Sequence, residues 1–221
     1  MTRTIRSLAL LAVGATLAAA CTVGGTPAPA SSNPPSTAPS TAGSPAAAGN
    51  CPTQQPPPLA AGEKRLVTIA TAKGEIGVTI EADLSPIAAG NFVALAECGY
   101  YDGVVFHRVV PGFVIQGGDP TGTGTGGPGY TIKDEPVTAT YGRSTVAMAR
   151  TPAADSVGSQ FFIVLDDEAR SSLADPSTNN YQIIGTVTAG MDAVDAIATA
   201  AAGQENPASP VVMDKVTVST P

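Results

Sequence analysis

The chain has 221 residues, a formal net charge of −7, one histidine and three cysteines. It contains no basic run, which argues against a nucleic-acid partner because phosphate contacts need clustered cations. One histidine and so few cysteines cannot supply a zinc site at the usual ligand spacing, and no EF-hand pattern surrounds the acidic residues, so we expect no metal.

The first 20 residues, MTRTIRSLALLAVGATLAAA, have the pattern of a secretory signal, with Arg3 and Arg6 followed by a short apolar run. This run is shorter than the roughly 20 apolar residues that a membrane span requires. Cys21 follows directly, and LAAAC resembles a bacterial lipobox. The resemblance implies cleavage before Cys21, lipid attachment to its thiol and an extracytoplasmic protein anchored to the bacterial cell membrane. The alternative is ordinary secretion with an incidental cysteine.

A segment rich in Pro, Ala, Ser and Thr follows, and ten of the chain's 20 prolines fall within residues 22–58. Such a segment has too few large apolar groups to offset the entropy of ordering. We therefore predict a disordered tether over 21–61 and one folded domain over 62–221. The remaining cysteines, Cys51 and Cys98, could form a disulfide outside the cytoplasm or stay unpaired.

The predicted domain begins with KRLVTIATAKGEIGVTI, two β-rich runs around Lys73 that indicate a hairpin. Ser85 can cap the helix that follows, Pro86 suits its first position and Gly99 suits its end. A second helix is predicted over 190–200 and a last strand in VVMDKVTV. Further strands are predicted over 104–110, 113–117, 145–149, 159–165 and 182–187. Many short strands with two isolated helices predict a mainly β domain, a closed barrel with helices over its ends.

Two familiar kinds of chemistry do not fit the motifs present. GTGTGG, residues 122–127, formally matches the dinucleotide-binding glycine pattern, but Pro128 follows at once and no helix can start there. A loop that lets backbone lie close to a bound peptide is the better interpretation. His107 has no partner serine in a G-x-S-x-G turn, which argues against a serine hydrolase. Ser159, in GSQFFIV, belongs to a predicted buried strand.

Two segments, FHRVVPGFVIQGGD and GSQFFIV, each combine aromatic rings with an amide side chain. Along a strand, Gln160 and Phe162 share a face because side chains alternate. Gln116 has the opposite parity to Phe113 unless a turn or bulge intervenes. Spacing alone does not separate a binding site from two ordinary core strands.

These two segments resemble the signature of the cyclophilin family of peptidyl-prolyl cis-trans isomerases. The resemblance runs in order through residues 64–218 and includes SPIAAGNFVAL, KDE, VAMARTP and YQIIGTV. It implies an eight-stranded antiparallel barrel with two capping helices, and an enzyme that isomerises X-Pro bonds in exported or cell-envelope proteins without a cofactor. The partners would be proline-containing polypeptides, and we expect a monomer. The alternative is a non-catalytic module that binds proline-containing peptides or acts as a chaperone.

The resemblance also assigns roles to residues. It implies that Arg108 is the catalytic arginine, with Gln160 and Phe162 beside it, while His107 orients its neighbours. Substrate binding is assigned to Phe113, Val114, Gln116, Gly124, Ala149, Arg150, Leu173 and Tyr181.

Several positions depart from the family pattern. Ser172 stands where many members carry a tryptophan that contributes to cyclosporin binding, so strong cyclosporin sensitivity is not expected. Where the family more often has Met, Asn and His, this chain has Val114, Arg150 and Tyr181. We expect these changes to alter substrate preference more than catalysis.

Overall fold

The structure is a computed structural model that describes residues 50–174 and 181–221. The predicted signal peptide, Cys21 and most of the predicted tether lie outside the described residues. The chain divides into two units, Met1–Thr41 and Ala42–Pro221, and everything described below belongs to the second. Within the described ranges, no helix is long and apolar enough to cross a membrane.

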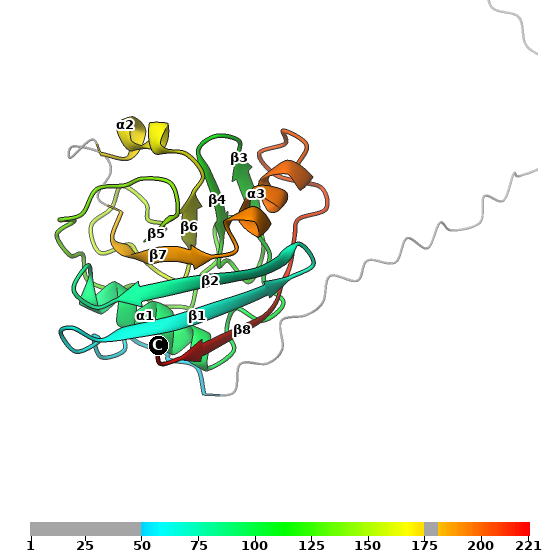
Figure 1. Ribbon diagram of the computed structural model, residues 1–221. Coiled ribbons are helices and arrows are strands. Elements are labelled where there is room, and N and C mark those ends of the chain that lie inside the picture. Colours follow the sequence, from blue (N-terminus) through cyan, green and yellow to red (C-terminus); the bar gives the residue numbers. More distant parts are fainter. Residues whose placement is uncertain (1–49, 175–180) are drawn as a thin grey trace, which may run out of the picture. The chain divides into compact units, whose positions relative to one another are not determined.

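Eight strands form one antiparallel sheet in the order β3-β4-β6-β5-β7-β2-β1-β8. Figure 1 shows β8, β1, β2 and β7 running across the lower part of the domain and β3, β4 and β6 standing behind them, so the sheet curls. The strands are β1 Lys64–Thr71, β2 Gly74–Glu81, β3 Arg108–Val110, β4 Val114–Gly117, β5 Thr145–Met148, β6 Phe161–Val164, β7 Ile183–Ala189 and β8 Met213–Ser219.

The predicted mainly β class and the eight antiparallel strands are confirmed. The segments that precede the two edge strands, β3 and β8, are joined by an isolated antiparallel bridge between Val105 and Val212. Full closure of the barrel stays a prediction.

The two predicted helices are present as α1 (Pro86–Glu97) and α3 (Met191–Ala200), and a short helical stretch, η1 (Asp167–Ala169) with α2 (Arg170–Leu173), was not predicted. Pro86 lies in the first turn of α1, and Gly99 follows the helix with a φ of 79° that suits glycine.

The predicted cap of α1 needs a correction. Ser85 occupies the N-cap position, but its hydroxyl makes no capping bond. The carboxylate of Glu135 accepts instead from the backbone N–H groups of Ile87 and Ala88, both at 2.9 Å. A charged acceptor near the positive end of a helix dipole stabilises the helix more than a hydroxyl does, and it comes here from a distant loop that the local pattern cannot show.

Alternation along β4 and β6 divides the apolar side chains between two clusters. Ile115, Phe161 and Ile163 belong to the main core, which includes residues of α1 and α3. Phe162 and Val164 face the other way, into a second cluster that includes Leu173 of α2. The period of two along a strand separates the clusters in this way. The second face carries the candidate site.

The folded part begins before the predicted boundary at residue 62. Cys51 forms a disulfide with Cys98, the residue that ends α1. Leu59 donates its N–H to the carbonyl of Pro86 at 3.1 Å, and the Gln55 side chain accepts from the N–H of Lys133 at 3.0 Å. These bonds hold the last residues of the predicted tether against the domain, which the low-complexity composition did not indicate.

Candidate active site

The register of the sheet sets Arg108, Gln116 and Phe162 in one row. Arg108 on β3 pairs with Gln116 on β4, which pairs with Phe162 on β6. Ala147 on β5 continues the row opposite Phe162. Directly opposed residues of an antiparallel sheet project to the same face. A cation, an amide and an aromatic ring from separate parts of the sequence are thereby brought side by side.

A turn resolves the parity of Gln116. Gly112, with a φ of 71°, and Phe113 form a turn before β4 begins at Val114. Val114 and Gln116 therefore share the strand face that carries the site, whereas Ile115 points into the main core. Phe113 reaches the same site from the turn. The alternation of side chains along a strand could not settle whether Phe113 and Gln116 share a site.

A small pocket of about 90 Å³ lies at this row. Phe162 is buried at 4% exposure, and its ring meets the Tyr181 ring edge-on with 5.2 Å between the centroids. Six of its nine lining residues are aliphatic or aromatic, and the other three carry an amide or a guanidinium group. The lining residues are Arg108, Phe113, Val114, Gln116, Ala149, Arg150, Phe162, Leu173 and Tyr181.

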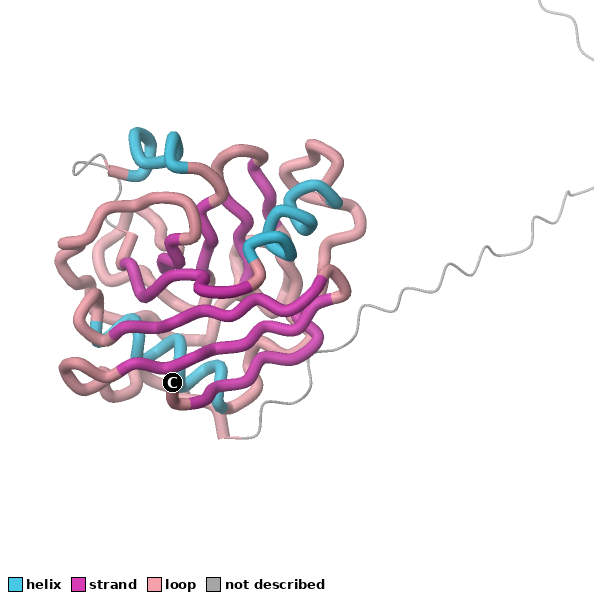
Figure 2. The backbone as a smooth tube through the Cα atoms, viewed as in Figure 1, coloured by secondary structure: helices cyan, strands magenta, loops and turns pink. Residues whose placement is uncertain are grey.

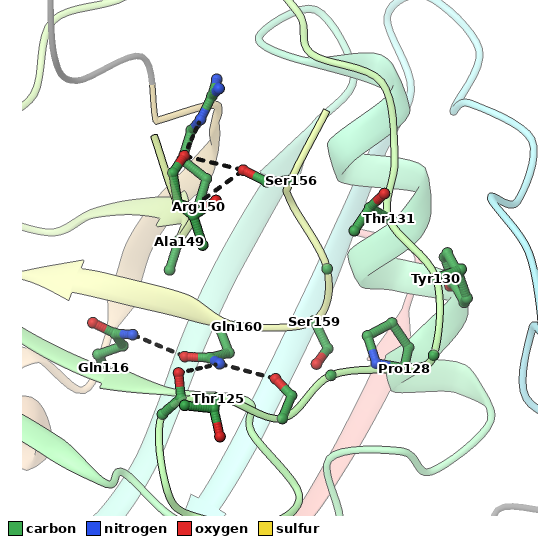
Figure 3. A pocket seen from close by; sticks show the side chains of 16 residues that line it. Gln116, Thr125, Pro128, Tyr130, Thr131, Ala149, Arg150, Ser156, Ser159 and Gln160 are labelled. Atoms are coloured by element: carbon green, nitrogen blue, oxygen red, sulfur yellow. Dashed lines mark hydrogen bonds between the residues drawn. The ribbon is translucent and has the colours of Figure 1, made fainter. Parts of the chain in front are cut away.

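A larger groove of about 770 Å³ adjoins the pocket and shares Gln116, Ala149 and Arg150 with it. One wall comes from the connection between β4 and β5, residues 118–144, which contains no helix or strand (Figure 2). Gly124 and Gln160 line this groove, and Figure 3 shows Gln160 there. The structure thus brings all the predicted catalytic and substrate-binding residues to the pocket or the groove.

The polar groups of the site form a chain of hydrogen bonds. Arg108 Nη1 lies 3.5 Å from Gln116 Oε1, and Gln116 Nε2 donates to Gln160 Oε1 at 2.9 Å. Gln160 Nε2 donates in turn to the carbonyl oxygens of Gly124 at 3.0 Å and Gly126 at 2.9 Å. Figure 3 shows the two amides lying end to end beneath the groove. These hydrogen bonds fix the orientation of both glutamine side chains.

Asp119, which the sequence reasoning missed, holds the glycine loop in place. It is fully buried, and its carboxylate accepts from the N–H groups of Thr121, Thr123, Gly124 and Gly126. Burial opposes the charged form, but these hydrogen bonds outweigh it and lower the pKa of Asp119 to about 2. An Asp-Pro pair directly before a Thr-Gly repeat is the local signal that could have indicated it, because Asp readily accepts from backbone two residues on.

His107 lies beside the same loop. Its side chain is 6% exposed, and neither ring nitrogen has a hydrogen-bond partner within the described part of the chain. A side chain at Gly124 would start 3.7 Å from the imidazole ring. Burial lowers the pKa of His107, which favours the neutral ring. The buried ring therefore lies beside Gly124, where it can support the loop by packing.

Arg150 lines both cavities but directs its guanidinium group elsewhere. Its side chain is 13% exposed and forms an ion pair with Asp134 at 3.0 Å. It also donates to the carbonyls of Thr151 and Ala153. Its charge therefore holds the 151–156 loop. Among the residues that the structure describes, no group of three or more His, Cys, Asp or Glu could hold a metal ion.

Comparison with known proteins adds an independent line of evidence. The family model described as cyclophilin type peptidyl-prolyl cis-trans isomerase matches residues 66–218. The chain is 39% identical over 173 residues to probable peptidyl-prolyl cis-trans isomerase A of Mycobacterium leprae, covering 69% of this chain and 91% of that protein. It is 47% identical over 127 residues to peptidyl-prolyl cis-trans isomerase B of Bacillus subtilis, covering 53% and 82% of the two chains.

Solved structures agree with these matches. A cyclophilin type peptidyl-prolyl cis-trans isomerase of Cryptosporidium parvum superposes with a TM-score of 0.63 at 29% identity, covering 72% of this chain and 99% of that one. A structure of the same protein in the presence of the dipeptide Ala-Pro gives a TM-score of 0.62 at 30% identity, with coverage of 71% and 99%.

Proposed function

We propose that this chain, which belongs to the cyclophilin-type peptidyl-prolyl cis-trans isomerases and is an enzyme of that class, acts on exported or cell-envelope proteins outside the cytoplasm. The signal pattern, the lipobox-like LAAAC and the proline-rich tether support an anchor through lipidated Cys21. The disulfide between Cys51 and Cys98 supports an oxidising compartment. The substrates would be proline-containing polypeptides.

The reaction is rotation about a partial double bond. An X-Pro bond isomerises over a barrier of about 18–20 kcal/mol because amide resonance gives the C–N bond double-bond character. Unassisted, the reaction takes tens of seconds or more. At the twisted transition state resonance is lost and the imide nitrogen regains its lone pair. A group that binds this state more tightly than the planar state accelerates the rotation.

Arg108 is the donor that we assign to the transition state. An arginine side chain presents a planar, positively charged fork of N–H groups. Within the described residues, Nη2 makes no hydrogen bond, so it is available to the imide nitrogen of a bound substrate. A donor that is fixed before the charge develops needs little reorganisation, and this preorganisation is the source of its effect.

The small pocket would hold the proline ring while the acyl side rotates. Phe113, Val114, Phe162, Leu173 and Tyr181 supply its apolar walls. The residues that precede the proline would lie along the larger groove, which is lined by Gln160 and the glycine loop. The single observation that carries the proposal is the row Arg108–Gln116–Phe162, which sets a fixed cationic donor at the edge of this pocket.

The envelope context has its own test. Expression of the full chain in a bacterium that processes lipoproteins, followed by mass spectrometry of the membrane fraction, should give a chain that begins at a diacylated Cys21. A Cys21→Ser variant should leave the membrane fraction and keep its isomerase activity. An unmodified Cys21 in a chain that is released to the medium would favour simple secretion. Size-exclusion chromatography with light scattering tests the proposed monomer.

A further inference from the structure

An acidic side chain outside the pocket holds the side chain of Arg108. Arg108 Nε donates to Oε1 of Glu205 at 2.7 Å. Glu205 belongs to the loop between α3 and β8 and lines neither the pocket nor the groove. No local motif links it to Arg108, which lies 97 residues earlier in the sequence.

The contact does not depend on two flexible side chains alone. The backbone carbonyl of Glu205 accepts from the N–H of Val109 at 2.8 Å, beside Arg108 itself. The far end of the same loop is also attached to this region, because Val211 accepts from the N–H of Phe106 at 2.9 Å. The carboxylate of Glu205 therefore starts from a backbone position that is fixed relative to β3.

We infer that Glu205 is a positioning residue that sets the aim of the Arg108 guanidinium toward the substrate; this rests on the role proposed for Arg108. Glu205 occupies Nε, and Gln116 faces Nη1 at 3.5 Å, so the plane of the guanidinium is held at two points. Among the described residues, Nη2 is the guanidinium nitrogen without a partner. The contacts with Glu205 and Gln116 therefore determine how Nη2 points toward a bound substrate. Holding a reacting group in its productive geometry lowers the entropic part of the barrier.

The exposure of the Arg108–Glu205 ion pair distinguishes a positioning role from a role in folding stability. The side chains of Arg108 and Glu205 are 34% and 57% exposed, and exposed ion pairs contribute little to folding stability. Loss of Glu205 should therefore slow the chemical step while it leaves the fold and peptide affinity nearly unchanged.

A matched control exists on α3. Asp195 forms an exposed ion pair with Arg143 at 2.6 Å, with side-chain exposures of 45% and 42%, and lines neither the pocket nor the groove. Asp195→Ala removes a carboxylate of similar exposure without touching Arg108. It should leave the isomerisation rate unchanged.

The test uses residues 21–221 with Cys21→Ser, so that the predicted tether and the domain are both present without lipid. Exchange NMR on an Ala-Pro-Phe peptide gives kcat/KM, and a titration gives the peptide Kd. Glu205→Ala should lower kcat/KM about 3- to 10-fold with Kd unchanged, because positioning errors act on the transition state. Glu205→Gln keeps an oxygen acceptor on a side chain of the same length. Its kcat/KM should lie between the values for Glu205→Ala and the wild type.

A spectroscopic measurement completes the test without substrate. The Nε–Hε signal of Arg108, assigned by its loss in Arg108→Lys, should be displaced and slow to exchange with water in the wild type and lose both features in Glu205→Ala. An unchanged or faster rate in Glu205→Ala would overturn the inference, as would a weaker Kd at unchanged kcat, which would make Glu205 a peptide contact. Absence of acceleration by the wild type would instead contradict the proposed function.

Discussion

Gln116 Nε2 donates to Gln160 Oε1 at 2.9 Å, and this bond links the small pocket to the larger groove of the candidate active site. Gln116 extends toward Arg108, and Gln160 extends toward the carbonyls of the glycine loop. The two amides thus connect the proposed donor to the groove that would hold the substrate backbone. A substitution at either glutamine should therefore affect both the pocket and the groove.

Replacing Gln160 tests this connection. Gln160→Leu preserves the approximate volume but removes the donor to Gly124 and Gly126 and the acceptor for Gln116. We expect kcat/KM to fall about 10-fold, corresponding to about 1.4 kcal/mol, with weaker peptide binding. Exchange NMR and titration measure both quantities. Gln54→Leu, at an exposed position away from the groove, is the control, and equal rates for the two variants would contradict the prediction.

The proline pocket predicts a separation of binding from stability. Phe162→Ala removes a buried ring and should destabilise the domain by about 3–5 kcal/mol in urea unfolding. It should also abolish measurable binding of an Ala-Pro peptide. Val164→Ala, in the same strand and the same apolar cluster but outside the pocket lining, should lose stability and retain binding. Loss of binding in both variants would place the binding defect in the fold rather than in the pocket.

Asp119 predicts a change of stability at acidic pH. Its pKa in the folded chain, about 2, is below the ordinary value of 3.8, so the charged carboxylate stabilises the fold above about pH 4. This contribution is lost as the pH falls from about 3.8 to about 2. Asp119→Asn should cost about 1–3 kcal/mol at neutral pH, because facing N–H groups lose their acceptor. Its stability curve should lack this acid-induced fall, and a curve parallel to that of the wild type would refute the assignment.

The disulfide between Cys51 and Cys98 predicts a redox dependence of stability. It closes a loop with a sequence separation of 47, and chain-entropy arguments give a contribution of about 4 kcal/mol. Urea unfolding with and without dithiothreitol measures it. A Cys51→Ser, Cys98→Ser double variant should match the reduced wild type and should not respond to the reductant. An unchanged urea midpoint after complete reduction would contradict this prediction. It would show that packing of residues 51–59 stabilises the domain without the disulfide.

Much of the architecture could be predicted because it depends on local patterns. The hairpin around Lys73 is confirmed, and Pro86 and Gly99 bound α1 as their conformational preferences indicate. The resemblance to a known family identified the residues that the structure gathers at the pocket and groove. The parity of Gln116 could not be settled, since it depends on where the turn at Gly112 ends and β4 begins.

What the sequence did not indicate depends on contacts between distant residues. Glu135 caps α1 from 48 residues away, and Glu205 meets Arg108 across 97 residues. Glu205 belongs to none of the motifs named above, and the KDE segment that contains Glu135 carries no local signal for capping α1. The packing of the loops on the sheet brings both residues to their partners. The docking of residues 51–59 is similar, because a disulfide and two hydrogen bonds fix a segment whose composition favours disorder.

The central claim is that a fixed guanidinium at position 108 accelerates X-Pro isomerisation. The most direct measurement is exchange NMR of an Ala-Pro-Phe peptide with residues 21–221 carrying Cys21→Ser, compared with the same chain carrying Arg108→Ala. We predict faster exchange with the unaltered site and a loss of about 100-fold in kcat/KM in the variant, as expected when one preorganised donor is removed. Equal acceleration by a folded Arg108→Ala protein would contradict the claim.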